Sequence, residues 1–158
     1  MKNIYCDGAC KGNPGESGSG IVVFEDTLPI FGIYGAYTEN GTNNIAELKA
    51  FKKALLLVEN VPTKIYVDSQ YTINSITKWS YNWKKNNWTK KGGIKNLELI
   101  KEIHEIYDSI KDNLEIIYVK GHSGNEGNDL ADNFANAAIK YKQKEWKKEL
   151  LWKNILKM

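Results

Sequence analysis

The first third of the chain has a hydrophobic pattern that predicts strands and then a helix. Apolar and polar residues alternate over 2–7, which indicates a strand, and the glycine-rich stretch 8–20 is expected to form a loop. Apolar runs over 20–25 and 30–37 predict an antiparallel hairpin. From Asn44 onwards, apolar residues recur at the spacing of a helix.

The rest of the chain alternates predicted strands with predicted helices. Short apolar segments at 64–68 and 115–119 predict strands. Helical spacing follows over 69–79, over 97–110 and from Glu126 onwards. A hairpin followed by strand–helix units predicts an α/β fold, with a five-stranded mixed sheet flanked by helices.

One domain is expected, because 158 residues with 42% hydrophobic content suit a single core. We assign this domain to residues 1–139. Residues 140–158 carry apolar side chains among lysines, a pattern that predicts a basic amphipathic helix extending the same domain. This tail could pack on the domain, extend a binding surface or contact a partner, and packing on the domain is the first expectation. Its apolar positions are Trp146, Leu150, Trp152, Ile155 and Leu156.

Composition indicates the cellular setting. No apolar run approaches the ~20 residues of a membrane span, and no signal peptide is visible. Cys6 and Cys10 are the only cysteines, and no nearby histidine completes a zinc site with them. We interpret them as free thiols in a reducing compartment. A cytoplasmic monomer without membrane contact is therefore expected.

Charge is distributed unevenly along the chain. The net charge is +3, yet the segment 69–97 contains six lysines and no acid. The segment 140–158 contains seven lysines and two glutamates, so the rest of the chain carries a net charge of −8. An acidic body with two basic segments indicates a polyanionic ligand that is held at those segments and acted on elsewhere.

Four acids occupy positions that favour a shared site. Asp7 and Asp68 each end a predicted strand, and open α/β sheets place their ligands at that edge, although turn and helix-cap roles explain these residues as well. Glu47 lies beside the apolar face of its helix, near Phe51, where an acid needs a partner. Asp132 lies on a helix edge, with a solvated position as the alternative. If the four meet, divalent cations would relieve their repulsion and supply chemistry.

Several segments carry a family resemblance in the right order. They are Tyr5–Cys10 with Gly12–Gly15, Thr42–Leu48, Asp68–Tyr71, Trp79–Trp88, and Val119–Gly124 continuing to Asp132. Together they resemble type 1 ribonuclease H, the family that cuts RNA within RNA/DNA hybrids. The resemblance covers approximately residues 1–139 and implies an RNase H-like fold.

The resemblance implies an endonuclease that hydrolyses the RNA strand of hybrids and leaves 5′-phosphate and 3′-hydroxyl ends. It implies that Asp7, Glu47, Asp68 and Asp132 bind two Mg²⁺ ions, for which Mn²⁺ could substitute. Carboxylates suit these hard cations. His122 would transfer a proton or assist the release of metal and product, and an ordinary loop histidine is the alternative.

The resemblance also implies a surface that binds the RNA/DNA hybrid. Thr42 and Trp79 would hold DNA-strand phosphates. The segment from Trp79 to Lys91 resembles the family's basic protrusion, which would grip the duplex through Trp83, Lys84 and Lys85. Packing, helix capping and solvated charge are the competing explanations. The residues implied to contact the RNA 2′-hydroxyl and the minor groove are Cys10, Asn13, Asn43, Asn44, Gln70 and Asn74.

Two other functions compete with this one. A non-catalytic hybrid-binding protein on the same scaffold is disfavoured, because a binder gains nothing from clustered acids. A related metal-dependent nuclease of other specificity is disfavoured by the paired Asn43 and Asn44 and by the basic protrusion.

Overall fold

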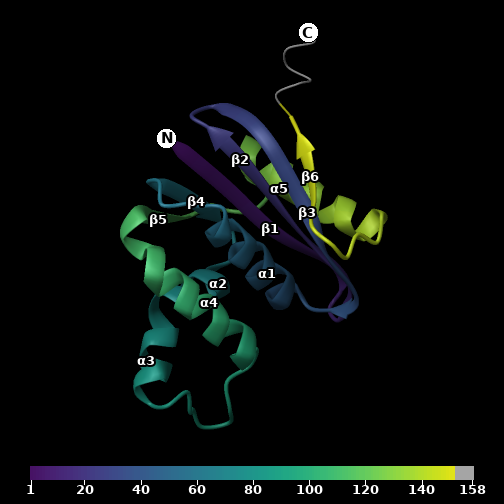
Figure 1. Ribbon diagram of the computed structural model, residues 1–158. Coiled ribbons are helices and arrows are strands. Elements are labelled where there is room, and N and C mark those ends of the chain that lie inside the picture. The colour runs from purple at the N-terminus through teal and green to yellow at the C-terminus, as the bar shows by residue number, and fades with distance from the viewer. Residues whose placement is uncertain (152–158) are drawn as a thin grey trace.

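The computed structural model describes residues 1–151, which form a six-stranded sheet covered by helices (Figure 1). The strands lie in the order β5-β4-β1-β2-β3-β6. The strands are β1 (Lys2–Gly12), β2 (Gly15–Glu25), β3 (Leu28–Gly41), β4 (Thr63–Val67), β5 (Leu114–Tyr118) and β6 (Lys147–Leu150). The helices are α1 (Asn43–Leu56), α2 (Gln70–Asn74), α3 (Ser80–Lys85), α4 (Leu97–Ile110) and α5 (Glu126–Lys140), with a π-helical turn, Ser75–Trp79, between α2 and α3.

The sheet is mixed, as the sequence predicted. β1 pairs with β2 in antiparallel and with β4 in parallel orientation, and β5 continues in parallel beside β4. β1, β2 and β3 form an antiparallel meander whose strands are longer than the predicted ones. The α/β fold class is confirmed, and the sheet has six strands instead of five because the tail adds β6.

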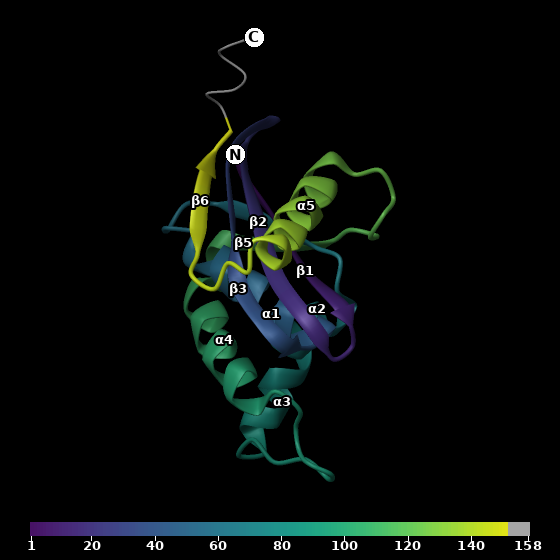
Figure 2. The same ribbon diagram turned by 90° about the vertical axis from the view of Figure 1, so that its right-hand side faces the viewer.

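Helices cover both faces of the sheet. α1 and α4 lie on one face and α5 on the other, which is clearest in the turned view (Figure 2). The α1 face holds the main core, where Leu48 and Phe51 join Ile4 and Ile65 of the sheet in one fully buried cluster. Burying each such side chain contributes about 1.5–3 kcal/mol, so α1 is held firmly. Within residues 1–151, no helix has the length and apolar character needed to cross a membrane.

The glycine-rich stretch 8–20 is not the predicted loop, because it forms the end of β1, a tight turn and the first part of β2. Its glycines mark places where helices approach the sheet closely. A Cβ on Gly8 would lie 2.5 Å from the backbone of Ala46 in α1. One on Gly20 would lie 2.4 Å from the carbonyl oxygen of Ala131 in α5. These glycines therefore serve packing, although in sequence they resemble a loop signal.

The tail also differs from its prediction. α5 ends at Lys140, and β6 pairs with β3 in antiparallel orientation in place of the predicted amphipathic helix. The edge of β3 offers backbone donors and acceptors that need partners, and pairing with the tail satisfies them. Trp146 packs against the main core, so this part of the tail packs on the domain. The predicted apolar positions Trp152, Ile155 and Leu156 lie outside the described residues.

Candidate active site

The pairing of β1 with β4 brings two of the candidate acids together. The strands are parallel, and Cys6 is opposite Val67 in their register. The next residue on each side is acidic, so Asp7 and Asp68 lie side by side where ligands of α/β sheets bind. Asp7 is 4% exposed, whereas Asp68 is half-buried.

A helix supplies the third acid. Thr42 caps α1 by accepting a hydrogen bond from the Ile45 N–H at 3.2 Å. Glu47 follows in the second turn of α1 and is buried against β1. The Gly8 N–H donates to Asp7 Oδ1 at 2.9 Å and to Glu47 Oε1 at 3.0 Å. One backbone group therefore holds two carboxylates in place.

Asp7, Glu47 and Asp68 each offer a carboxylate oxygen, and these oxygens lie within 4.8 Å of one another. Glu47 Oε2 is buried and has no hydrogen-bond partner in the described part of the chain. A buried oxygen without a partner costs about 1–3 kcal/mol, which a bound cation would offset. Carboxylate oxygens are the ligands that hard divalent cations prefer. The cluster therefore fits a divalent metal ion.

The electrostatics of the cluster also favour a cation. Burial, together with the charge of Glu47, raises the pKa of Asp7 far above its usual range. Burial raises the pKa of Glu47 to about 8 and also raises that of Asp68, to which the charge of Asp132 adds. Three acids in one buried space cannot all be ionised without a compensating positive charge.

Asp132 takes a separate position. It lies half-exposed on α5 and, among the described residues, is not part of the three-carboxylate cluster. Asn136 Nδ2 donates to the Asp132 carbonyl oxygen at 2.9 Å and to its Oδ1 at 3.3 Å. The four candidate ligands thus divide into a cluster of three, two of them buried, and one separate acid.

His122 lies on the exposed loop between β5 and α5. Its φ of 55° is left-handed, and Gly124 follows with a φ of 84°, so the loop turns sharply. A Cβ on Gly121 would lie 3.1 Å from Asp68 Oδ2, which shows that the loop passes directly beside the cluster. His122 is therefore close to the acids in the fold while its side chain is exposed.

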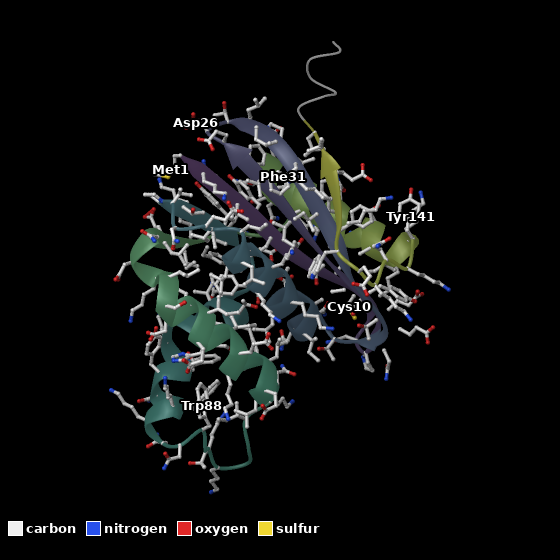
Figure 3. All side chains as sticks on the ribbon, viewed as in Figure 1. Met1, Cys10, Asp26, Phe31, Trp88 and Tyr141 are labelled. Atoms are coloured by element: carbon white, nitrogen blue, oxygen red, sulfur yellow. The ribbon has the colours of Figure 1, made fainter. Side chains whose placement is uncertain are left out.

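Several candidate substrate contacts gather at the start of α1. Asn43 and Asn44 are exposed there. Asn13 Oδ1 accepts a hydrogen bond from the Asn43 N–H at 3.1 Å, and Thr42 caps the helix, so both have structural roles as well. Cys10 lies near the turn at the same end of β1 (Figure 3), half-buried, with its Sγ 3.6 Å from the Gly41 carbonyl oxygen.

A groove of about 600 Å³ separates the start of α1 from a projecting segment, residues 75–95, which we call the handle (Figure 1). Trp79 is 45% exposed, and its ring centroid lies 6.0 Å from that of Trp83. Lys90 Nζ lies 5.9 Å from the Trp83 ring centroid. This handle groove is lined by Asn44, Tyr71, Ser75, Trp79, Trp83 and the loop 90–95.

The structure does not bring every candidate into this groove. Lys84 Nζ donates to Glu105 at 3.0 Å, so its charge is partly compensated within the domain. Lys85 and Gln70 are exposed, and Asn74 is half-buried in α2, but none of them lines the handle groove. Trp79 and Trp83 are therefore the predicted handle residues that shape it.

Residues 1–140 match the model of the RNase H family. The chain belongs to the RNase H family. A ribonuclease H of Acidovorax sp. (strain JS42) is 41% identical over 142 residues, covering 86% of this chain and 93% of the relative. A ribonuclease H of Francisella tularensis subsp. novicida (strain U112) is 39% identical over 137 residues, covering 85% and 88% respectively. The RNase H assignment makes this chain an endoribonuclease.

Solved RNase H structures share the fold. The PFV RNase H domain has a TM-score of 0.70 at 27% identity, covering 89% of this chain and 94% of that one. LC9-RNase H1, a type 1 RNase H with the type 2 active-site motif, has a TM-score of 0.78 at 23% identity, covering 91% and 74%. LC11-RNase H1, solved with an RNA/DNA hybrid, has a TM-score of 0.67 at 23% identity, covering 90% and 99%.

A buried pair that the sequence patterns did not predict fixes the handle of this RNase H chain. His104 of α4 is 1% exposed, and its Nδ1 lies 2.6 Å from Ser80 Oγ, which donates to the Ile76 carbonyl oxygen at 2.8 Å. A buried hydrogen bond therefore joins α4 to the start of α3. The rings of Tyr81 and Trp88 stand edge-on to His104, with ring centroids at 4.5 Å and 5.5 Å. Trp88 lies in the projecting handle (Figure 3). The sequence signal that could have predicted this pair is a histidine among the apolar positions of α4.

His104→Ala is expected to lower the free energy of unfolding by about 2–4 kcal/mol, because it leaves a cavity and removes the buried hydrogen bond to Ser80 Oγ. Urea unfolding followed by tryptophan fluorescence would measure this change. Ser80→Ala tests the hydrogen bond alone and should cost about 1–3 kcal/mol. The matched control is His122→Ala, at an exposed histidine, which should stay within about 0.5 kcal/mol. Equal effects of the two histidine substitutions would contradict a fixing role for His104.

Proposed function

We propose that this chain is an endonuclease that hydrolyses the RNA strand of RNA/DNA hybrids with two divalent cations and leaves 5′-phosphate and 3′-hydroxyl ends. The observation that carries the proposal is the buried cluster of Asp7, Glu47 and Asp68, with its unpartnered Glu47 oxygen, in a chain of the RNase H family. Such a cluster destabilises a fold unless it binds a cation, so a purely structural role is disfavoured.

The three clustered acids would hold the cations, Mg²⁺ or Mn²⁺, and Asp132 would add an outer ligand. When bound, two such cations activate a water for attack on the phosphodiester and stabilise the departing 3′ oxygen. The chain itself keeps the ligands in place before substrate arrives. The Gly8 N–H fixes Asp7 and Glu47 together, and the close contact of β1 with α1 prevents them from separating.

His122 is proposed to deliver a proton to the departing 3′ oxygen or to assist product release. Its support is positional, because Gly121 borders Asp68 and the sharply turned loop leaves the imidazole exposed. An exposed imidazole on a loop can both accept and donate a proton next to the bound phosphate.

His122→Ala is expected to lower kcat by about 10- to 100-fold without abolishing cleavage, because the cluster itself remains intact. Steady-state kinetics on a labelled hybrid would measure kcat and KM, and KM should change little. Ser123→Ala on the same loop serves as the control. A kcat equal to that of the wild type would exclude His122 from the reaction.

Hybrid specificity is supported by the surface on either side of the cluster. Asn43 and Asn44 present exposed amides that can bind the RNA 2′-hydroxyl and minor-groove edges, and exposed Gln70 adds a third. The handle groove, with Trp79 and its lysines, offers positive charge to phosphates of the other strand. The hybrid complex of LC11-RNase H1, which shares the fold, is consistent with this substrate.

The proposal is tested with a labelled RNA/DNA hybrid, double-stranded RNA and double-stranded DNA of one sequence. In Mg²⁺ or Mn²⁺, only the RNA strand of the hybrid should be cut, and chelator should stop the reaction. End analysis would then identify the termini. Hybrid binding without cleavage in either metal would favour the non-catalytic binding protein, and comparable cleavage of the other duplexes would favour a nuclease of other specificity.

A further inference from the structure

A second basic groove lies beside the handle groove. It has a volume of about 380 Å³ and lies between α1, α4 and the segment that precedes β6. Lysines dominate its wall, with one acid, Glu145, among them. We call it the tail groove, and its polar and aromatic lining residues are Lys49, Lys52, Lys53, Lys144, Glu145 and Trp146.

The tail segment is fixed in place where it forms this groove. The Tyr37 N–H donates to the Gln143 carbonyl oxygen at 3.0 Å, and the Ala36 N–H donates to that of Lys144 at 2.9 Å. A Cβ on Gly35 would lie 2.7 Å from the Glu145 carbonyl oxygen, so this glycine permits the close approach. Lys144 is therefore carried on an ordered backbone at the rim of the groove.

Three ammonium groups in the tail groove have no acidic partner in the part of the chain that the structure describes. Lys52 pairs with Glu102 of α4, whereas Lys49, Lys53 and Lys144 form no salt bridge within residues 1–151. Lys53 Nζ lies 5.7 Å from the ring centroid of Trp146. Lys49 and Lys53 are one helical turn apart, so their charges repel in the absence of an anion. The groove therefore favours a ligand with several negative charges.

The tail groove continues the handle groove along two helices. The handle groove is lined by Asn44 of α1 and by Lys95, which precedes α4, whereas the tail groove is lined by Lys49 of α1 and Leu99 of α4. Asn44 and Lys49 are five residues apart in the sequence, and Lys95 and Leu99 are four apart. These separations correspond to roughly 6–7.5 Å where the segment is helical. Figure 1 shows α1 and α4 next to each other above the handle. Lysines thus line one path from the handle to the tail.

We propose that the tail groove binds the phosphodiester backbone of a single strand that extends beyond the hybrid and leaves the handle groove. The inference rests on the proposed function, because the hybrid must first occupy the handle groove. A narrow basic groove that tracks one backbone is the usual form of a single-strand site. The strand is DNA or RNA, and the two share the phosphodiester chemistry that the lysines recognise.

The test measures affinity for three hybrids, with Asp68→Asn in every protein so that the substrate stays intact in Mg²⁺. One hybrid is blunt, one has a DNA overhang of about ten nucleotides, and one has an RNA overhang of the same length. The groove variant combines Lys49→Ala, Lys53→Ala and Lys144→Ala. The control variant loses the same charge outside the groove, through alanine at Lys64, Lys140 and Lys142.

One overhang is expected to tighten binding by about tenfold at low salt, and the strand that does so identifies the ligand. The groove variant should lose this gain and keep its affinity for the blunt hybrid, whereas the control variant should keep the gain. For the overhang complex of the groove variant, the slope of log affinity against log salt concentration should be smaller by about 2. The variant loses three lysines, and each single-strand phosphate contact contributes about 0.7 to this slope.

Two results would overturn the proposal. The first is that neither overhang tightens binding. The second is that the groove and control variants lose the gain equally, which would make the effect one of net charge. Failure of the proposed function is distinguishable, because it is measured with the protein that keeps Asp68, which would then leave the blunt hybrid uncut in Mg²⁺ and in Mn²⁺.

Discussion

Asp68→Asn is expected to lower the cleavage rate by at least about a thousandfold while leaving the fold and the hybrid affinity close to those of the wild type. Asp68 is the half-buried member of the carboxylate cluster, and one of its oxygens lies within 4.8 Å of those of Asp7 and Glu47. Asparagine keeps the shape of the side chain and removes the negative charge that would hold a cation. Single-turnover cleavage of a labelled hybrid would measure the rate.

Circular dichroism and a binding titration would show that the variant remains folded and binds its substrate. Asp112→Asn, at an exposed aspartate outside the site, is the matched control and should cut at the wild-type rate. A rate for Asp68→Asn within about tenfold of the wild type would exclude Asp68 as a metal ligand of the reaction.

Asp7→Asn is expected to stabilise the metal-free protein, although it should also abolish activity. Asp7 is 4% exposed and shares its space with two other acids, so removing its charge relieves repulsion. Asparagine Oδ1 can still accept the hydrogen bond from the Gly8 N–H. We expect a gain on the order of 2 kcal/mol and a rise in Tm of about 4–8 °C in chelator.

The stability that Asp7→Asn gains over the metal-free wild type should increase with pH. Burial raises the pKa of Asp7 above its ordinary 3.8 and that of Glu47 to about 8, so both groups bind protons more tightly in the folded than in the unfolded protein. The stability associated with these raised pKa values is present below about pH 4 and is lost as pH rises towards about 8. Thermal melts in chelator at about pH 5 and about pH 8 would therefore show the larger difference at the higher pH.

Added Mg²⁺ should reverse the order of stability, because the wild type gains a bound cation and Asp7→Asn loses a ligand. Asp112→Asn should follow the wild type in both conditions. If Asp7→Asn is less stable than the wild type in chelator at about pH 8, the acids do not repel one another in the metal-free fold.

Local sequence patterns predicted the parts of the site that depend on single elements. Asp7 and Asp68 follow apolar strand patterns, so their meeting at the sheet edge required only that the two strands be parallel neighbours. Glu47 could be found because an acid beside a buried helix face needs a partner. The outer position of Asp132 could not be predicted, because it depends on how closely α5 approaches the sheet. That approach is set by Gly20 of β2.

Long-range contacts explain the predictions that were wrong. Glycines in 8–20 look like loop residues until α1 and α5 are placed against them. The tail has a helical pattern, but its conformation is decided by the unpaired edge of β3, which lies over a hundred residues earlier. His104 joins two segments whose proximity arises only after the handle folds back on α4.

The strand β6 also changes which edge of the sheet is accessible to other protein chains. β3 is 14 residues long and rich in apolar side chains, and a bare edge of that kind invites a strand from a neighbouring chain. β6 pairs with Phe31–Tyr34 of this edge. Among the described residues it presents an outer strand of four residues, three of which are the charged Lys147, Lys148 and Glu149. The tail, which also lines the tail groove, therefore protects this edge of the sheet against edge-to-edge aggregation.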